Sequence, residues 1–133
     1  VIELYRAVQN GDRELAAAYS TADLFVLPAV LDAKGDTEGL GVVLLEAMAS
    51  HVPVVASAAG GITDVVVDGE SGLLVPPADP DALARALVRL HADPELRARL
   101  AANGARRVRD EFSWDAIADR WAQVYRDAVA GKR

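Results

Sequence analysis

The chain contains no cysteine, and its 133 residues include only two histidines. Disulfide bonds and thiolate metal sites are therefore excluded. His51 and His91 lie far apart in the sequence, without the spacing of a ligand pair, so we expect no metal site. Aromatic residues are also scarce at 5%, whereas hydrophobic residues make up 52% of the chain. This composition is typical of helices packed on a sheet and argues against disorder.

The chain also lacks an excess of positive charge and a long hydrophobic run. Its formal net charge is −6, whereas nucleic-acid binding usually needs a basic face, so we expect no nucleic-acid partner. The longest apolar run, Leu24–Leu31, contains a proline and is too short to span a bilayer. The arginines between Arg97 and Arg109 have acidic neighbours, so we interpret them as a solvated face rather than a membrane surface. No signal-peptide pattern opens the sequence, and we expect a cytoplasmic location.

Short apolar segments alternate with segments of helical periodicity along the chain. We expect strands at residues 2–8, 23–28, 53–56 and 72–75, and helices at residues 13–20, 41–50 and 62–67. This alternation predicts an α/β fold, a partial Rossmann-like parallel sheet with flanking helices and a helical C-terminal tail. We expect a single partial domain over residues 1–133, with an α/β part at 1–77 and C-terminal helices at 78–133.

Three start signals mark the C-terminal helices. Asp79-Pro80 and Asp93-Pro94 each combine a capping carboxylate with proline at the first helical position, and Ser113 is the third candidate cap. The second of these helices carries Asn103-Gly104, a weak point in a helix that we expect to reach about Glu111. The last helix has an apolar stripe with a spacing of three or four residues, which consists of Trp114, Ile117, Trp121, Val124 and Ala128.

The most informative segment runs Glu38-Gly-Leu-Gly-Val-Val-Leu-Leu-Glu46. It begins as a loop with two glycines and ends in an apolar helix, whose first backbone amides can bind an anion. The two carboxylates can accept hydrogen bonds from hydroxyl groups on either side of that anion. A nucleotide-sugar has this layout. Two solvated acids, or an acid pair of the kind found in glycosidases, are the alternative interpretations.

A second glycine pair, Gly60-Gly61, follows the expected strand at residues 53–56 and precedes a short helix. Open parallel sheets bind ligands beyond the carboxyl ends of their strands. Gly60 and Gly61 therefore form a possible ligand loop, although a plain turn between a strand and a helix explains them equally well.

Five sequence blocks together resemble the C-terminal, nucleotide-sugar-binding lobe of GT-B-fold glycosyltransferases. The resemblance is to the retaining, family 4-like group (glycosyl transferases group 1), incomplete at the N-terminus. The blocks are Ala22–Pro28, Glu38–Ala49, Pro53–Ser57, Gly60–Ile62 and Asp68–Pro77. Residues 1–77 would then be the donor-binding part.

The resemblance implies a role for each residue of the Glu38–Glu46 segment. Glu38 would accept hydrogen bonds from hydroxyls of the donor sugar, and Glu46 from both ribose hydroxyls. The backbone amides of Gly39, Leu40, Gly41 and Val42 would face the sugar and the diphosphate. The family transfers sugar from a nucleoside-diphosphate donor to a hydroxyl acceptor, retains the anomeric configuration and usually needs no metal, so we expect no cofactor.

The sequence also departs from the family pattern. Arg6 stands where a glycine is usual, the loop at residues 31–37 is long and polar, and Thr63-Asp64 replaces Pro-Glu. The resemblance further implies an acceptor-binding N-terminal lobe and a cationic Arg/Lys pair, which this sequence does not contain. We therefore expect the isolated chain to be inactive, with either the missing lobe or a second copy as partner at the open sheet edge and the terminal helices. A non-catalytic interaction module and a fragment of a nucleotide-sugar epimerase are the alternatives.

Overall fold

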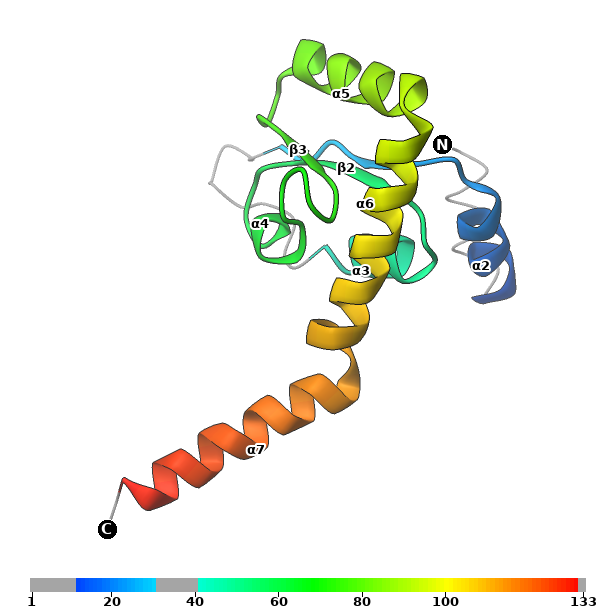
Figure 1. Cartoon of the computed structure of the whole chain (residues 1–133). Coiled ribbons are helices and arrows are strands. Elements are labelled where there is room, and N and C mark those ends of the chain that lie inside the picture. Colours follow the sequence, from blue (N-terminus) through cyan, green and yellow to red (C-terminus); the bar gives the residue numbers. More distant parts are fainter. Residues whose placement is uncertain (1–11, 31–40, 132–133) are drawn as a thin grey trace.

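The computed structural model describes residues 12–30 and 41–131. Its sheet has three parallel strands in the order β1-β2-β3. The register pairs Val26 with Val55 and Ala56 with Leu74. The elements follow in the order α2 (Asp12–Thr21), β1 (Phe25–Leu27), α3 (Val42–Ala49), β2 (Val54–Ser57), α4 (Ile62–Val65), β3 (Leu73–Val75), α5 (Pro80–Ala92), α6 (Pro94–Arg107), η1 (Val108–Phe112) and α7 (Trp114–Ala130). Figure 1 shows helices covering the sheet and α7 extending away from it.

The central strand β2 divides the hydrophobic core into two layers. Side chains alternate between the faces of a strand. Val54 and Ala56 therefore face a cluster with Leu44 and Met48 of α3, whereas Val55 faces a second cluster that includes Leu100 of α6. The strand is buried on both faces, as expected for the middle of a parallel sheet covered by helices.

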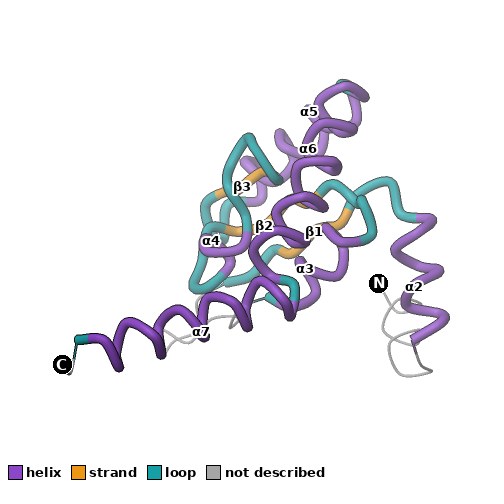
Figure 2. The backbone as a smooth tube through the Cα atoms, turned by 60° about the horizontal axis from the view of Figure 1, so that its bottom comes forward, coloured by secondary structure: helices purple, strands orange, loops and turns teal. Residues whose placement is uncertain are grey.

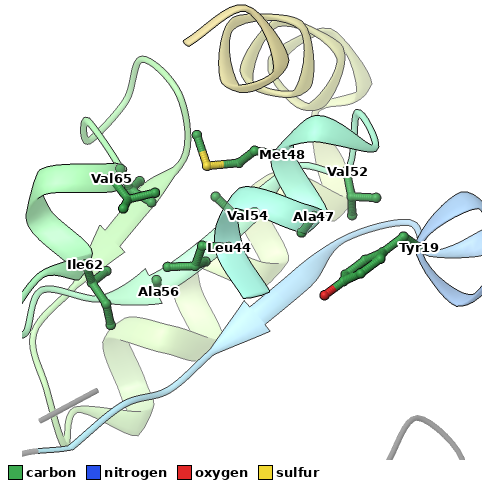
Figure 3. Packing of buried hydrophobic residues seen from close by; sticks show 10 residues of the cluster. Tyr19, Leu44, Ala47, Met48, Val52, Val54, Ala56, Ile62 and Val65 are labelled. Atoms are coloured by element: carbon green, nitrogen blue, oxygen red, sulfur yellow. The ribbon is translucent and has the colours of Figure 1, made fainter. Parts of the chain in front are cut away.

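The first layer packs α3 and α4 against the sheet. Figure 3 shows Leu44, Ala47 and Met48 of α3 beside Ile62 and Val65 of α4, and all five side chains are fully buried. Helix α6 crosses close to this layer at Gly104. A Cβ atom at that position would lie 3.3 Å from Cγ of Met48 and 3.1 Å from the carbonyl oxygen of Ser71. The glycine predicted to weaken the helix is therefore a point of close approach between α6 and α3.

The second layer is formed by α5 and α6. Both begin as the sequence predicts. The carboxylate of Asp79 accepts a hydrogen bond from the amide of Ala82 at 2.8 Å, and Asp93 accepts from Leu96 at 2.9 Å. Ser113 caps α7 in the same way, through the amide of Ala116 at 3.2 Å.

The chain leaves the core after η1, whose Val108 and Phe112 still pack against the first cluster. The helix expected to reach about Glu111 changes instead into a π-helix, η1, before α7 begins. In Figures 1 and 2, α7 points away from the sheet. No residue of α7 is buried by the described part of the chain, and Trp114 is 86% exposed. Across residues 12–30 and 41–131, no helix has the length and apolar character needed to cross a membrane.

The predicted α/β fold class is confirmed. The strands expected at 23–28, 53–56 and 72–75 correspond to β1, β2 and β3, and the helix expected at 62–67 is shorter and ends at Val65. The strand expected at 2–8 and the loop at 31–37, with Arg6, lie outside the described residues.

Candidate functional site

Helix α3 begins at a buried glycine. Gly41 has φ 68° and ψ 53°, in the left-handed region, and no described side chain caps the helix. A Cβ atom at Gly41 would lie 3.1 Å from Cδ1 of Leu44 and 3.7 Å from side-chain atoms of both Leu27 and Ile62. The left-handed backbone and this close packing together favour glycine here. They also show that the start of α3, the end of β1 and the start of α4 meet at one edge of the sheet.

Glu46 lies one turn into α3 and is half-buried. Its Oε2 atom accepts a hydrogen bond from the hydroxyl of Tyr19, at 3.0 Å. The same hydroxyl lies 3.3 Å from the carbonyl oxygen of Val43. Tyr19 comes from α2, is 6% exposed, and packs its ring against Phe25 with the centroids 5.9 Å apart. The last turn of α2 thus places a phenol directly against a carboxylate of α3.

The environment of Tyr19 keeps its hydroxyl protonated. Burial, the hydrogen bond to Glu46 and the charge of that carboxylate all raise the pKa of Tyr19 well above its usual value. The hydroxyl therefore acts as a donor over the physiological pH range. A hydrogen bond to an ionised acceptor is stronger than one to a neutral carbonyl, so the proton is directed to Glu46 rather than to Val43.

The second glycine pair lies between β2 and α4. Gly60 has φ 50°, and Gly61 is the residue before the first turn of α4, where no described side chain caps the helix. Arg107 holds the other end of α4. Its guanidinium donates to the carbonyl oxygens of Asp64 and Val65, both at 2.9 Å.

Arg107 is itself held in place by η1. Its Nη1 atom lies 2.8 Å from Oε1 of Glu111, and its guanidinium lies 5.6 Å from the ring centroid of Phe112. Carbonyl groups at the end of a helix have no partner within the helix. Arg107 supplies that partner and fixes the short helix that follows Gly60 and Gly61.

A cavity of about 180 Å³ opens at the carboxyl ends of the three strands. Pro28 follows β1, Ser57 ends β2 and Val75 ends β3, and all three line this cavity. The carboxylate of Asp79 in this lining caps α5, and none of the described residues that line the cavity is a lysine or arginine. This cavity therefore suits an apolar or ring-shaped group better than a phosphate.

The structure places only part of the predicted site. Gly41, Val42 and Glu46 lie on the first two turns of α3, and Gly60 and Gly61 lie at the start of α4. Glu38, Gly39 and Leu40 lie outside the described residues. Where the structure describes the chain, no group of three or more His, Asp or Glu residues could hold a metal ion.

Sequence reasoning missed Tyr19 and Arg107. Tyr19 lies four residues after Leu15, on the same face of α2, which marks it only as a packing residue. Its partner Glu46 is 27 positions away, and the carbonyls bound by Arg107 are 42 and 43 positions away. No local pattern in the sequence connects residues at such separations.

Comparison with known proteins identifies the family that this chain matches. The family described as glycosyl transferases group 1 matches residues 6–107. The D-inositol 3-phosphate glycosyltransferase of Salinispora arenicola is 46% identical over 122 residues, which are 92% of this chain. The chain spans only 25% of the length of that relative.

Solved structures share the fold. Sucrose-phosphate synthase from Thermosynechococcus elongatus is 43% identical, with a TM-score of 0.72 over 91% of this chain and 29% of its own. The C-terminal domain of a glycosyl transferase group 1 protein, LpcC from Francisella tularensis, is 32% identical, with a TM-score of 0.65 over 78% of this chain and 51% of its own. HepE from Anabaena, in complex with UDP-glucose, is 25% identical, with a TM-score of 0.71 over 87% of this chain and 30% of its own.

These matches confirm the predicted resemblance. The family pattern covers most of the chain, and the related structures place the three-stranded sheet and its helices in the C-terminal lobe of the GT-B fold. The chain therefore belongs to the glycosyl transferases group 1 family.

Proposed function

We propose that this chain is the donor-binding part of a glycosyltransferase. In the whole protein, it would bind a nucleoside-diphosphate sugar whose sugar passes to a hydroxyl acceptor. The observation that carries the proposal is the half-buried Glu46 carboxylate, which Tyr19 holds one turn above the glycine start of α3. A half-buried carboxylate beside the amides of a helix N-terminus is suited to a ligand with hydroxyls next to a phosphate.

The dimensions of α3 support this assignment. Glu46 follows Val42 by four residues, which is about 6 Å along a helix. In our proposal the amides of Gly39, Leu40, Gly41 and Val42 face the diphosphate, and Glu46 accepts hydrogen bonds from the ribose hydroxyls. Glu38 would bind the sugar, and the backbone at Gly60 and Gly61 would also approach the ligand. UDP-glucose bound to HepE, a protein of the same fold, is a ligand of this class.

Transfer itself is proposed for the whole protein rather than for these 133 residues. An enzyme of this type acts mainly by positioning donor and acceptor and by stabilising the departing diphosphate. The curated relative of Salinispora arenicola is about four times as long as the matched part. We expect the 133-residue chain to bind nucleotide weakly and to transfer no sugar, so sugar transfer by the purified chain would contradict this expectation.

Titration calorimetry of the purified chain with UDP, GDP and ADP tests the binding proposal. We expect one of these nucleotides to bind, and Glu46→Gln to weaken that binding by about tenfold or more, because it removes a charged acceptor. Glu70→Gln, in an exposed turn, is the matched control and should bind normally. Absence of binding to all three nucleotides would overturn the proposal and favour the non-catalytic interaction module.

A cytoplasmic location and metal-independent binding also remain predictions. Repeating the titration with EDTA and with Mg²⁺ checks the second of them. Equal affinity under both conditions is expected, because the amides of a helix N-terminus can bind an anion without a cation.

A further inference from the structure

The hydroxyl of Tyr19 is the only described donor to the Glu46 carboxylate. It approaches Oε2 at 3.0 Å from a ring that is 6% exposed. The ring packs on Phe25 within the same core cluster as Leu44, so the position of the hydroxyl is set by buried contacts on two sides. Figure 3 shows this ring beside α3, with its oxygen directed away from α2.

This geometry leaves part of the carboxylate free. A carboxylate has about four acceptor positions on its two oxygens, and Tyr19 occupies one of them. A glutamate on a helix surface would otherwise sample several rotamers, and holding it still lowers the entropy lost when a ligand binds. No other described residue donates to this carboxylate, so within the described part of the chain Oε1 and the second acceptor position of Oε2 stay open to a ligand in a fixed orientation.

We infer that Tyr19 is a positioning residue that aims the Glu46 carboxylate at a pair of adjacent ligand hydroxyls. It thereby lets the site distinguish a ribonucleotide from a 2′-deoxyribonucleotide. This inference rests on the proposed function, because it needs a nucleotide at the start of α3. The discrimination follows because a fixed carboxylate loses one of two hydrogen bonds when the 2′-hydroxyl is absent.

The ring and the hydroxyl of Tyr19 can be separated by substitution. Tyr19→Phe removes the donor but keeps the ring that packs on Phe25 and the core, so the fold should persist. Tyr125→Phe is the matched control, because Tyr125 is 67% exposed on α7 and lies far along the chain from Glu46. Thermal unfolding of both variants checks that they are folded.

The binding experiment compares a nucleoside diphosphate with its 2′-deoxy form in each variant. The probes are UDP and 2′-deoxy-UDP, or the corresponding GDP or ADP pair if that nucleotide binds better. We expect Tyr19→Phe to weaken binding of the ribonucleotide about two- to tenfold, the range for one immobilised side chain. Binding of the deoxy form should change much less, and adding Tyr19→Phe to Glu46→Gln should cause no further loss.

The preference for ribose is the ratio of the affinities for the nucleoside diphosphate and its 2′-deoxy form. If this ratio is unchanged in Tyr19→Phe, the inference is overturned, even if both affinities fall together. A second measurement keeps the inference testable if no nucleotide binds to the wild-type chain. Three-bond NMR couplings of the Glu46 side chain should report one rotamer in the wild type and averaged rotamers in Tyr19→Phe. If the couplings are the same in the wild type and in Tyr19→Phe, the positioning role alone is overturned. If the couplings differ but no nucleotide binds, only the proposed function is overturned.

Discussion

Helices α6 and α7 carry similar sequence signals, but only α6 is part of the core. Each begins at a side chain that caps its first turn, and each has an apolar stripe at helical spacing. Helix α6 buries Leu96, Leu100, Ala101 and Gly104, whereas α7 has no buried residue within the described part of the chain. Periodicity identifies the face that a helix can bury, while the path of the chain decides whether anything covers that face.

The path changes at the junction between the two helices. Up to Arg107, α6 lies against the sheet and α3, and its Leu100 packs in the cluster with Val55 of the central strand. The π-helix η1 then redirects the chain, and α7 extends outward (Figure 2). Substitutions in α6 should therefore affect global stability strongly and those in α7 only slightly.

The largest effect is expected for Leu100→Ala. Leu100 is fully buried, so its removal leaves a cavity and should lower the free energy of unfolding by about 2–5 kcal/mol. Val124→Ala, at a position 56% exposed on α7, should change it by less than about 0.5 kcal/mol. Urea unfolding measures both values, and similar losses would contradict the proposed difference between the helices.

Arg107→Met should have the next largest effect, since Arg107 joins the end of α6 to α4. The substitution keeps the apolar stem but leaves the carbonyls of Asp64 and Val65 without their charged donor, which costs about 1.5–3 kcal/mol. Arg106→Met is the control, because among the described residues the Arg106 guanidinium bonds only to Asn103. Hydrogen exchange should quicken in α4 for Arg107→Met alone; unchanged exchange there would show that Arg107 does not hold α4.

Removing the helix caps should give a smaller difference in stability between a substitution in α6 and one in α7. Asp93→Ala should lower the free energy of unfolding by about 1 kcal/mol, because α6 unfolds together with the core. Ser113→Ala should reduce the helical circular dichroism signal without moving the urea midpoint, because α7 can fray independently. A shift of the midpoint in Ser113→Ala would show that α7 unfolds cooperatively with the core.

Trp121→Ser should also have only a small effect on stability. Trp121 is 59% exposed, and its ring centroid lies 6.2 Å from that of Tyr125 on the same helix. We expect a change within about 0.5 kcal/mol by urea unfolding. A loss as large as that of Leu100→Ala would mean that another polypeptide covers α7. Sedimentation of the wild-type chain would then show whether that cover is a second copy.

The elements that the sequence predicts are those with local signals. The apolar run at Val54, Val55 and Ala56 predicts a buried strand, and Asp79 and Asp93 followed by proline predict the starts of α5 and α6. The change to a π-helix at Val108 has no such signal, and neither has the early end of α4.

The candidate site also contains some residues that the sequence marks locally and others that it does not. Gly41 and Glu46 are recognisable from the sequence, because a glycine loop, an apolar helix and an acid lie within nine residues. Tyr19 and Arg107 are not recognisable in this way, because Tyr19 reaches Glu46 from another helix and Arg107 reaches α4 from the end of α6.

The sequence alone determines the family, the order of strands and helices, the helix caps and the candidate ligand-binding residues, because each is encoded by neighbouring residues. Only the tertiary structure decides that Tyr19 holds Glu46, that Arg107 fixes α4 and that the stripe of α7 lies exposed. These features depend on how the parallel crossovers bring distant segments together. A contact between side chains many positions apart is a property of that packing rather than of any local pattern.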